Sequence, residues 1–183
     1  MADEETMQTC AGMVPDWLLD AATQGGEPPM TETDALVQHG RAAAITALAH
    51  RGQTDKIGRP YLEHPVRVAE RFSWTGEPIA HCAALLHDVV EDSDFTLEDL
   101  GHAGIRAEII EIVALLTRDK AVDDATYYSR IRMHPRALAV KLADIDDNTA
   151  AWRVEQLDPA LQKRLALKYQ RARQALGADT STG

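Results

Sequence analysis

The sequence predicts an all-α protein, a compact arrangement of helices around one core, and three observations lead to this prediction. Apolar residues recur at the spacing of a helix face through most of residues 34–176, and no run alternates with the period of two that is typical of a half-buried strand. Capping residues, glycines and prolines fall where these apolar runs begin and end. Hydrophobic residues make up 45% of the 183 residues, which is enough for a single domain with its own core.

The first half of the chain contains three expected helices. Residues 34–50 are rich in Ala and Leu, and Thr31 or Thr33 can serve as the N-cap. A loop containing glycine and proline follows, and a second helix is expected over residues 63–73. The third begins near Pro78, and its run IAHCAALLHDVV is almost wholly apolar. A helix that is apolar on all sides is buried, so we expect it at the centre of the fold.

The second half contains the remaining helices. Thr96, followed by two acidic residues, signals a helix start. Further helices are expected over residues 105–117, 127–133 and 136–153, the last two separated by a proline. A final long helix over residues 159–177 has a proline in its first turn and ends at a glycine, which is the usual asymmetry of helix termini.

The two ends of the chain differ in composition from this helical part. We expect residues 1–30, which end in GGEPPM, to be a flexible N-terminal tail, and residues 178–183 to be a disordered C-terminal end. Residues 31–177 then form one domain. The N-terminus has no basic segment followed by an apolar one, so it is not a secretory signal, and we expect a cytoplasmic protein.

Charge and composition exclude several classes of function. The chain carries 19 basic and 29 acidic residues, a net charge of −10, which disfavours binding to nucleic acid or to anionic membranes. No apolar run is long enough to span a bilayer. The two cysteines, Cys10 and Cys82, form neither a disulfide framework nor a metal-binding pair.

The run CAALLHDVVEDSD places four polar groups at the end of the buried helix. These are His87, Asp88, Glu91 and Asp92. Ionised carboxylates are almost never buried without a partner or a metal ion, and residues four apart share a helix face. The run can therefore supply metal ligands and, one turn later, catalytic carboxylates. The alternative is a helix end that turns out into solvent.

Two further segments contain candidate ligands. In KLADIDDN, Asp144 follows a buried helical pattern, and in YLEHP, His64 lies at a helix start. Taken alone, Asp144 could simply pair with Lys141, and His64 could be an ordinary surface residue. Together with the His87 segment they provide two imidazoles and two carboxylates, a set that suits Mn²⁺, Fe²⁺ or Zn²⁺. Such an ion polarises phosphoryl oxygens and lowers the pKa of water.

The order of these three segments, H…HD…D, resembles the HD-domain superfamily of metal-dependent phosphohydrolases. The stretches AHRGQTDKIGRPYLEHPVRVAE, AALLHDVVEDSDFTLEDL and VKLADIDDNT are similar to the hydrolase domain of RelA/SpoT-type enzymes and of stand-alone small alarmone hydrolases. The resemblance covers roughly residues 34–176. It implies a compact helical HD-domain fold, one Mn²⁺ ion, and removal of the 3′-pyrophosphate from (p)ppGpp, a phosphorylated nucleotide.

The resemblance also implies a role for individual residues. It gives four metal ligands: His64, His87, Asp88 and Asp144. Glu91 and Asp92 match the catalytic acidic pair, one of which would orient or deprotonate the attacking water. Lys56 and Asn148 match residues that hold the nucleotide.

The sequence departs from the family at two places. The family usually has Arg-Lys where this chain has Asp55-Lys56, and a basic, His-containing run where this chain has IDDNTA, with Asp146 and Asp147. Both changes remove positive charge near a polyanionic substrate. Hydrolysis of another phosphoester, such as a nucleoside mono- or triphosphate, is therefore an alternative function, and a non-catalytic nucleotide-binding module is a further one.

Overall fold

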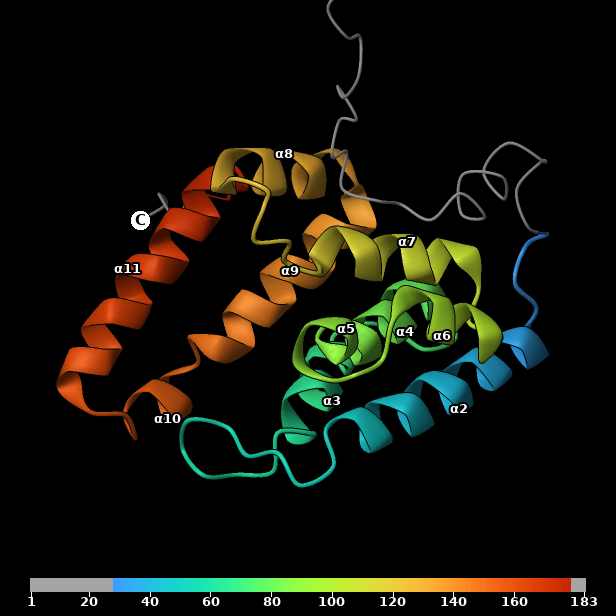
Figure 1. Cartoon of the computed structure of the whole chain (residues 1–183), viewed down its shortest axis with the longest axis horizontal. Helices are drawn as coiled ribbons and strands as arrows, with labels where there is room; N and C mark the ends of the chain where they lie inside the picture. Colours follow the sequence, from blue (N-terminus) through green and yellow to red (C-terminus); the bar gives the residue numbers. More distant parts are fainter. Residues whose placement is uncertain (1–27, 179–183) are drawn as a thin grey trace, which may run out of the picture.

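The computed structural model describes residues 28–178, and this part of the chain is helical, with no strand (Figure 1). A single bridge between Thr54 and Pro60 closes the loop between the first two helices described. The helices are α2 (Glu32–Ala49), α3 (Glu63–Ala69), α4 (Pro78–Leu86), α5 (Val89–Asp92), α6 (Leu97–His102), α7 (Ala107–Leu116), α8 (Asp124–Met133), α9 (Pro135–Asn148), α10 (Ala151–Val154) and α11 (Pro159–Ala175). The predicted all-α class is confirmed.

Helix α4 lies at the centre of the fold, as its apolar sequence predicts. Every residue from Ala80 to Leu86 is buried. The helix packs against α2, α3, α7 and α9, so apolar neighbours surround it. Full burial of a large aliphatic side chain such as Leu86 contributes about 1.5–3 kcal/mol. In Figure 1, α8 and α11 lie on the far side of α9 from α4, and α2 lies on the opposite side of the molecule.

Helix starts follow the capping signals in the sequence. Of the two candidate caps for α2, the structure selects Thr31, whose side chain accepts a hydrogen bond from Asp34 N while Asp34 bonds back to the backbone of Thr31. Thr96 and Asp99 make the same reciprocal arrangement at α6. Helix α8 begins three residues before the predicted start, because Asp123 caps it.

The predicted third helix is interrupted just where its polar residues begin. Helix α4 ends at Leu86, and α5 starts only at Val89. Two carbonyl groups at the interruption face side-chain donors. His87 Nδ1 lies 2.7 Å from the oxygen of Ala84, and Thr46 Oγ1 lies 2.8 Å from that of Leu85 and also 2.8 Å from that of Ala42, so the hydroxyl hydrogen is shared between two acceptors. Such donors replace backbone hydrogen bonds that a helix end leaves open. The expectation of a continuous helix here was wrong.

The predicted helix over residues 136–153 is also divided, into α9 and α10. Thr149 Oγ1 bonds back to the carbonyl of Ile145 at 2.7 Å, and Ala150 is extended, with φ −57° and ψ 131°. A threonine that bonds to the preceding turn bends or ends a helix. Helix α10 therefore begins as a separate helix at Ala151.

The predicted N-terminal tail lies largely outside the described residues. Of its last three residues, Pro28 accepts a hydrogen bond from Arg106 at 2.8 Å, and Met30 packs against the core. Among the helices described, none has the length and apolar character needed to cross a bilayer.

Candidate metal centre

Three separate parts of the fold bring the four predicted ligands together. His64 comes from the first turn of α3, His87 and Asp88 from the interruption between α4 and α5, and Asp144 from α9. Consecutive residues of an unbroken helix point about 100° apart. At the interruption, Asp88 Oδ2 approaches His64 on α3 and His87 Nε2 approaches Asp144 on α9.

The ligand atoms of these residues lie close to one another. His87 Nε2 is 3.1 Å from Asp88 Oδ2, and His64 Nε2 is 3.6 Å from the same oxygen. Asp144 Oδ1 lies 3.3 Å from His64 Nε2 and 3.8 Å from His87 Nε2. The ligands of one ion with bonds of roughly 2 Å lie about 3 Å apart. The mutual spacing of His64, His87 and Asp88 fits a shared cation, and Asp144 approaches this group through the two histidines.

Both imidazole rings are held by a hydrogen bond from Nδ1. His64 Nδ1 donates to Asp147 Oδ2 at 2.7 Å, and His87 Nδ1 donates to the carbonyl of Ala84 at 2.7 Å. In the neutral form of each ring, these bonds place the proton on Nδ1 and leave the Nε2 lone pair facing the carboxylates. Metal-binding histidines are usually fixed in this way by a hydrogen bond to the other ring nitrogen.

The hydrogen bonding of the two Nε2 atoms indicates whether a cation fits between the ligands. Within residues 28–178, His64 Nε2 and His87 Nε2 are buried and make no hydrogen bond. Buried polar atoms without a partner are rare because they carry a desolvation cost. A divalent cation between these nitrogens and the two carboxylates would satisfy both, and two nitrogen and two oxygen donors suit a borderline ion.

The electrostatics of the cluster favour a positive charge inside it. Burial alone would lower the pKa of His87, but the carboxylates of Asp88 and Asp144 outweigh it and raise that pKa well above its ordinary value. Burial would raise the pKa of Asp144, yet Lys141 and the two histidines hold it well below its usual range. The carboxylates therefore stay ionised.

Neighbouring side chains orient the two carboxylates. Tyr61 donates its hydroxyl hydrogen to Asp88 Oδ2 at 2.5 Å. Lys141 Nζ lies 2.8 Å from Asp144 Oδ2, and Asn148 Nδ2 donates to Asp144 Oδ1 at 2.5 Å. The simple ion pair between Lys141 and Asp144 thus exists in addition to the approach of Asp144 to the histidines. Asn148, predicted to contact the nucleotide, lies beside the cluster.

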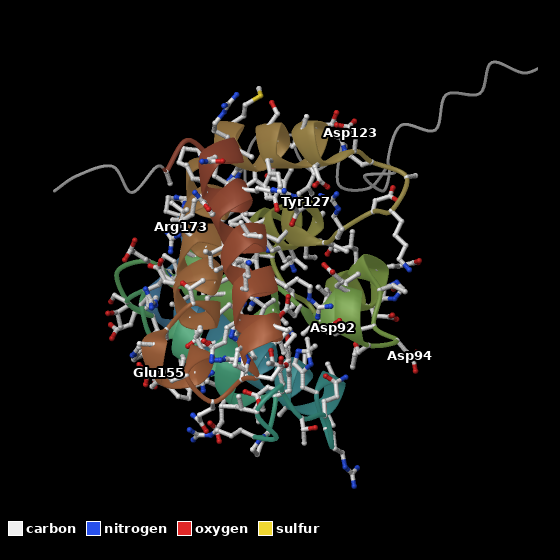
Figure 2. All side chains as sticks on the ribbon, turned by 90° about the vertical axis from the view of Figure 1, so that its left-hand side faces the viewer. Asp92, Asp94, Asp123, Tyr127, Glu155 and Arg173 are labelled. Atoms are coloured by element: carbon white, nitrogen blue, oxygen red, sulfur yellow. The ribbon has the colours of Figure 1, made fainter. Side chains whose placement is uncertain are left out.

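The predicted catalytic carboxylates lie on the short helix α5, next to the cluster. Glu91 Oε2 accepts a hydrogen bond from Arg118 N at 3.1 Å. Burial raises the pKa of Glu91 and of Asp92, and the negative charge of Asp88 adds to both effects. Figure 2 shows Asp94 at the outer edge of this region and Asp92 nearer the body of the molecule.

The loop between α2 and α3 holds the other predicted nucleotide contact, Lys56, which is exposed. The adjacent Asp55 turns inward. Its Oδ1 accepts hydrogen bonds from the backbone of Ile57 and Arg59, and its Oδ2 lies 3.3 Å from Arg153 NH2. The negative charge of Asp55 is therefore paired inside the protein.

Asp147 has a role that its sequence context did not predict, where it was only an unfavourable charge. Asp147 is 4% exposed and accepts hydrogen bonds from His64, Arg67 and Arg153. Asp146 instead faces outward and pairs with Arg71 and Arg173. The one available signal was spacing: Asp147 lies three residues after Asp144, on the same helix face.

The fold and the site together define a helical protein with a His/Asp cluster suited to a divalent cation. Residues 61–150, a segment that contains all four cluster residues, match the family described as "HD domain". The chain belongs to the HD-domain family.

Several individual proteins are similar to this chain. The chain is 36% identical over 163 residues to the guanosine-3′,5′-bis(diphosphate) 3′-pyrophosphohydrolase of Vibrio cholerae, covering 82% of this chain and 22% of that protein. It is 32% identical over 146 residues to the bifunctional (p)ppGpp synthase/hydrolase SpoT of Escherichia coli, covering 73% and 20%. A GTP pyrophosphokinase of Streptomyces coelicolor is 34% identical over 138 residues, covering 65% and 15%. The chain thus spans less than a quarter of the length of these relatives.

A solved structure shares the fold. It belongs to a metazoan ortholog of SpoT that is described as hydrolyzing ppGpp. The TM-score is 0.61 at 23% identity, with 78% of this chain and 88% of that chain covered. The likeness extends over most of both chains, so the arrangement of helices described above is the HD-domain arrangement.

Proposed function

We propose that this chain is a metal-dependent phosphohydrolase that removes the 3′-pyrophosphate from (p)ppGpp or a related nucleotide. The observation that carries the proposal is the convergence of His64 Nε2 and His87 Nε2 on two carboxylates, with both nitrogens buried and free of hydrogen bonds within residues 28–178. The names of the Vibrio cholerae and Escherichia coli relatives support the choice of substrate.

In this proposal one divalent cation, with Mn²⁺ as the preferred ion, is held by four side chains: His64, His87, Asp88 and Asp144. Mixed nitrogen and oxygen donors support Mn²⁺ over Mg²⁺, which prefers oxygen ligands alone. When bound, the ion supplies Lewis-acid chemistry, since it polarises a phosphoryl oxygen and acidifies water. Tyr61, Lys141 and Asn148 keep the two carboxylates in the orientation that ligation needs.

In this proposal, the acidic pair on α5 accepts the proton of the attacking water. Desolvation and the negative charge of Asp88 raise the pKa of Glu91, so its carboxylate is a better proton acceptor than an ordinary glutamate. The hydrogen bond from Arg118 N fixes one of its oxygens. Asp92, one residue further, would share in orienting the water.

Positive charge for the phosphates is proposed to come from Lys56 and Lys141. Lys141 has a side chain that is 20% exposed, although Asp144 engages it. Lys56 is exposed in the loop before α3 and would meet the nucleotide there. We place Asn148 beside the substrate as well, because it already lies against Asp144 at the cluster.

The environment of Asp55 favours a second candidate function, hydrolysis of another nucleotide phosphoester. The family pattern has an arginine where this chain has Asp55, and the nearby Arg153 is buried between Asp55 and Asp147. Neither side chain is then free to contact a substrate base. A pocket changed in this way would accept a different nucleotide while the metal chemistry stayed the same.

One assay separates the two functions. The purified chain is incubated with Mn²⁺ and, separately, with ppGpp, GTP, deoxynucleoside triphosphates and nucleoside monophosphates, and products are resolved by anion-exchange chromatography. We expect ppGpp to yield GDP and pyrophosphate, and the Asp144→Ala variant to yield neither. Turnover of another nucleotide with ppGpp left intact would reject the alarmone substrate and support the second candidate. The expected cytoplasmic location is part of the proposal and is tested by fractionating cells that express the tagged chain.

A further inference from the structure

A chain of buried ion pairs connects helix α10 to the candidate metal centre. Arg153 is 8% exposed and uses both ends of its guanidinium group: NH1 lies 2.6 Å from Asp147 Oδ2, and NH2 lies 3.3 Å from Asp55 Oδ2. Asp147 Oδ2 is the same atom that accepts the hydrogen bond from His64 Nδ1 at 2.7 Å. The side chain of Asp147 thus links Arg153 to His64.

From this connection we propose that Arg153 is a positioning residue, which holds Asp147 against His64 and thereby sets the affinity of the centre for its cation. The inference rests on the proposed metal ligands. A single carboxylate that accepts from His64, Arg67 and Arg153 can shift or rotate if one donor is lost. Arg67, on α3, binds Asp147 through Nε at 2.7 Å and NH2 at 3.0 Å, and Arg153, on α10, supplies the remaining restraint.

By holding Asp147, Arg153 controls the direction in which the lone pair of His64 Nε2 points. Asp147 fixes the proton of His64 on Nδ1, and the Nε2 lone pair then points at Asp88 and Asp144. A rotation of Asp147 would let the ring tilt or take its other tautomer, with the lone pair turned away from the cation. Loss of a hydrogen-bond partner behind a metal-binding histidine typically weakens metal binding by about 10- to 100-fold.

Asp146 provides a matched control within the same helix turn. It is the sequence neighbour of Asp147 and is also paired with arginines, yet it does not touch His64: Arg71 NH1 lies 2.9 Å from Asp146 Oδ2. Replacing Arg71 with methionine removes an Asp–Arg pair from α9, as replacing Arg153 does. Of these two arginines, only Arg153 contacts the carboxylate that binds His64.

A double-mutant cycle measured by Mn²⁺ titration calorimetry tests the proposal without any substrate. We expect Arg153→Met to weaken Mn²⁺ binding by roughly tenfold, and to have less than about a twofold effect in the Asp147→Asn background, while Arg71→Met leaves affinity within about twofold of the parent chain. An equal loss in both backgrounds, or no loss in either, would overturn the proposal.

Folding of each variant is followed by circular dichroism. If Arg153→Met does not fold, Arg153→Lys replaces it in the same cycle: lysine keeps the buried charge but cannot bridge two carboxylates, and its loss of affinity must again disappear when Asp147 is Asn. Because the readout is binding alone, inactivity toward ppGpp would reject the proposed substrate and leave this result standing. Absence of Mn²⁺ binding by the parent chain would overturn the metal assignment and the inference with it.

Discussion

Some residues of the centre are proposed as metal ligands, and others hold those ligands in place. Asp144 contacts residues of both kinds. Its Oδ1 faces the two histidines, while Oδ2 binds Lys141. The sequence could identify Asp144 because it lies in a short motif read along one helix. The support given by Asp147 could not be predicted in the same way, since its partner His64 lies 83 residues away and only the fold brings them together.

Removal of Asp144 is predicted to abolish Mn²⁺ binding. The Asp144→Ala variant lacks one of four ligands and leaves Lys141 without its carboxylate partner, so a positive charge remains where the cation would bind. Titration calorimetry with Mn²⁺ checks this, and Asp146→Asn, which changes an outward-facing carboxylate on the same helix, serves as the control. Retained Mn²⁺ occupancy in Asp144→Ala would show that the ligand set is wrong.

Glu91→Gln is predicted to keep the metal and to lose turnover by about 10²- to 10⁴-fold, the usual contribution of a general base. Burial raises the pKa of Glu91, so protonation begins at a higher pH than in an ordinary glutamate. Because the carboxylate form is needed, kcat/KM of the parent chain should fall as the pH falls through this raised pKa. A pH series for both proteins checks the assignment; the same acid limb in Glu91→Gln would transfer the role to Asp92.

At the scale of helices, the apolar pattern predicted where nearly every element lies, because helix formation and capping depend on neighbours within one or two turns. The interruption after Leu86 escaped prediction. A contact from outside the segment accompanies it: the hydroxyl of Thr46 on α2, 39 residues before Leu85 in the chain, lies 2.8 Å from the carbonyl of Leu85. The pattern of the segment itself, IAHCAALLHDVV, continues as a helix.

Thr46→Val tests the importance of that hydroxyl. The substitution preserves the shape of the side chain but leaves the buried carbonyl of Leu85 without its donor, which is predicted to cost about 1–3 kcal/mol of unfolding free energy. Urea unfolding measures the loss, and Thr46→Ser, which retains the hydroxyl, is the control. Equal stability of the Val variant and the parent chain would mean that the interruption does not depend on this bond.

Across the whole molecule, the net charge of −10 and the local charge of the centre lead to the same expectation, namely stabilisation by a bound cation. A ligand that binds only the folded state at 100 times its Kd adds about 2.7 kcal/mol. For a domain of this size that corresponds to a rise in Tm of roughly 5–10 °C.

We therefore predict that Mn²⁺ raises the Tm of the parent chain and leaves that of Asp144→Ala unchanged, as measured by differential scanning calorimetry. Equal shifts for both proteins would indicate that Mn²⁺ acts on the acidic surface and not at the centre.

The wide spacing of the four cluster residues along the chain also determines when the centre can exist during synthesis. His64, His87 and Asp88 emerge from the ribosome long before Asp144 on α9, and Asp147, which orients His64, follows it. A nascent chain that ends before α9 holds two imidazoles and one carboxylate but lacks both Asp144 and the Asp147 that orients His64. Selective capture of a cation is therefore a late event, and it would report that α9 has docked against α3 and α4.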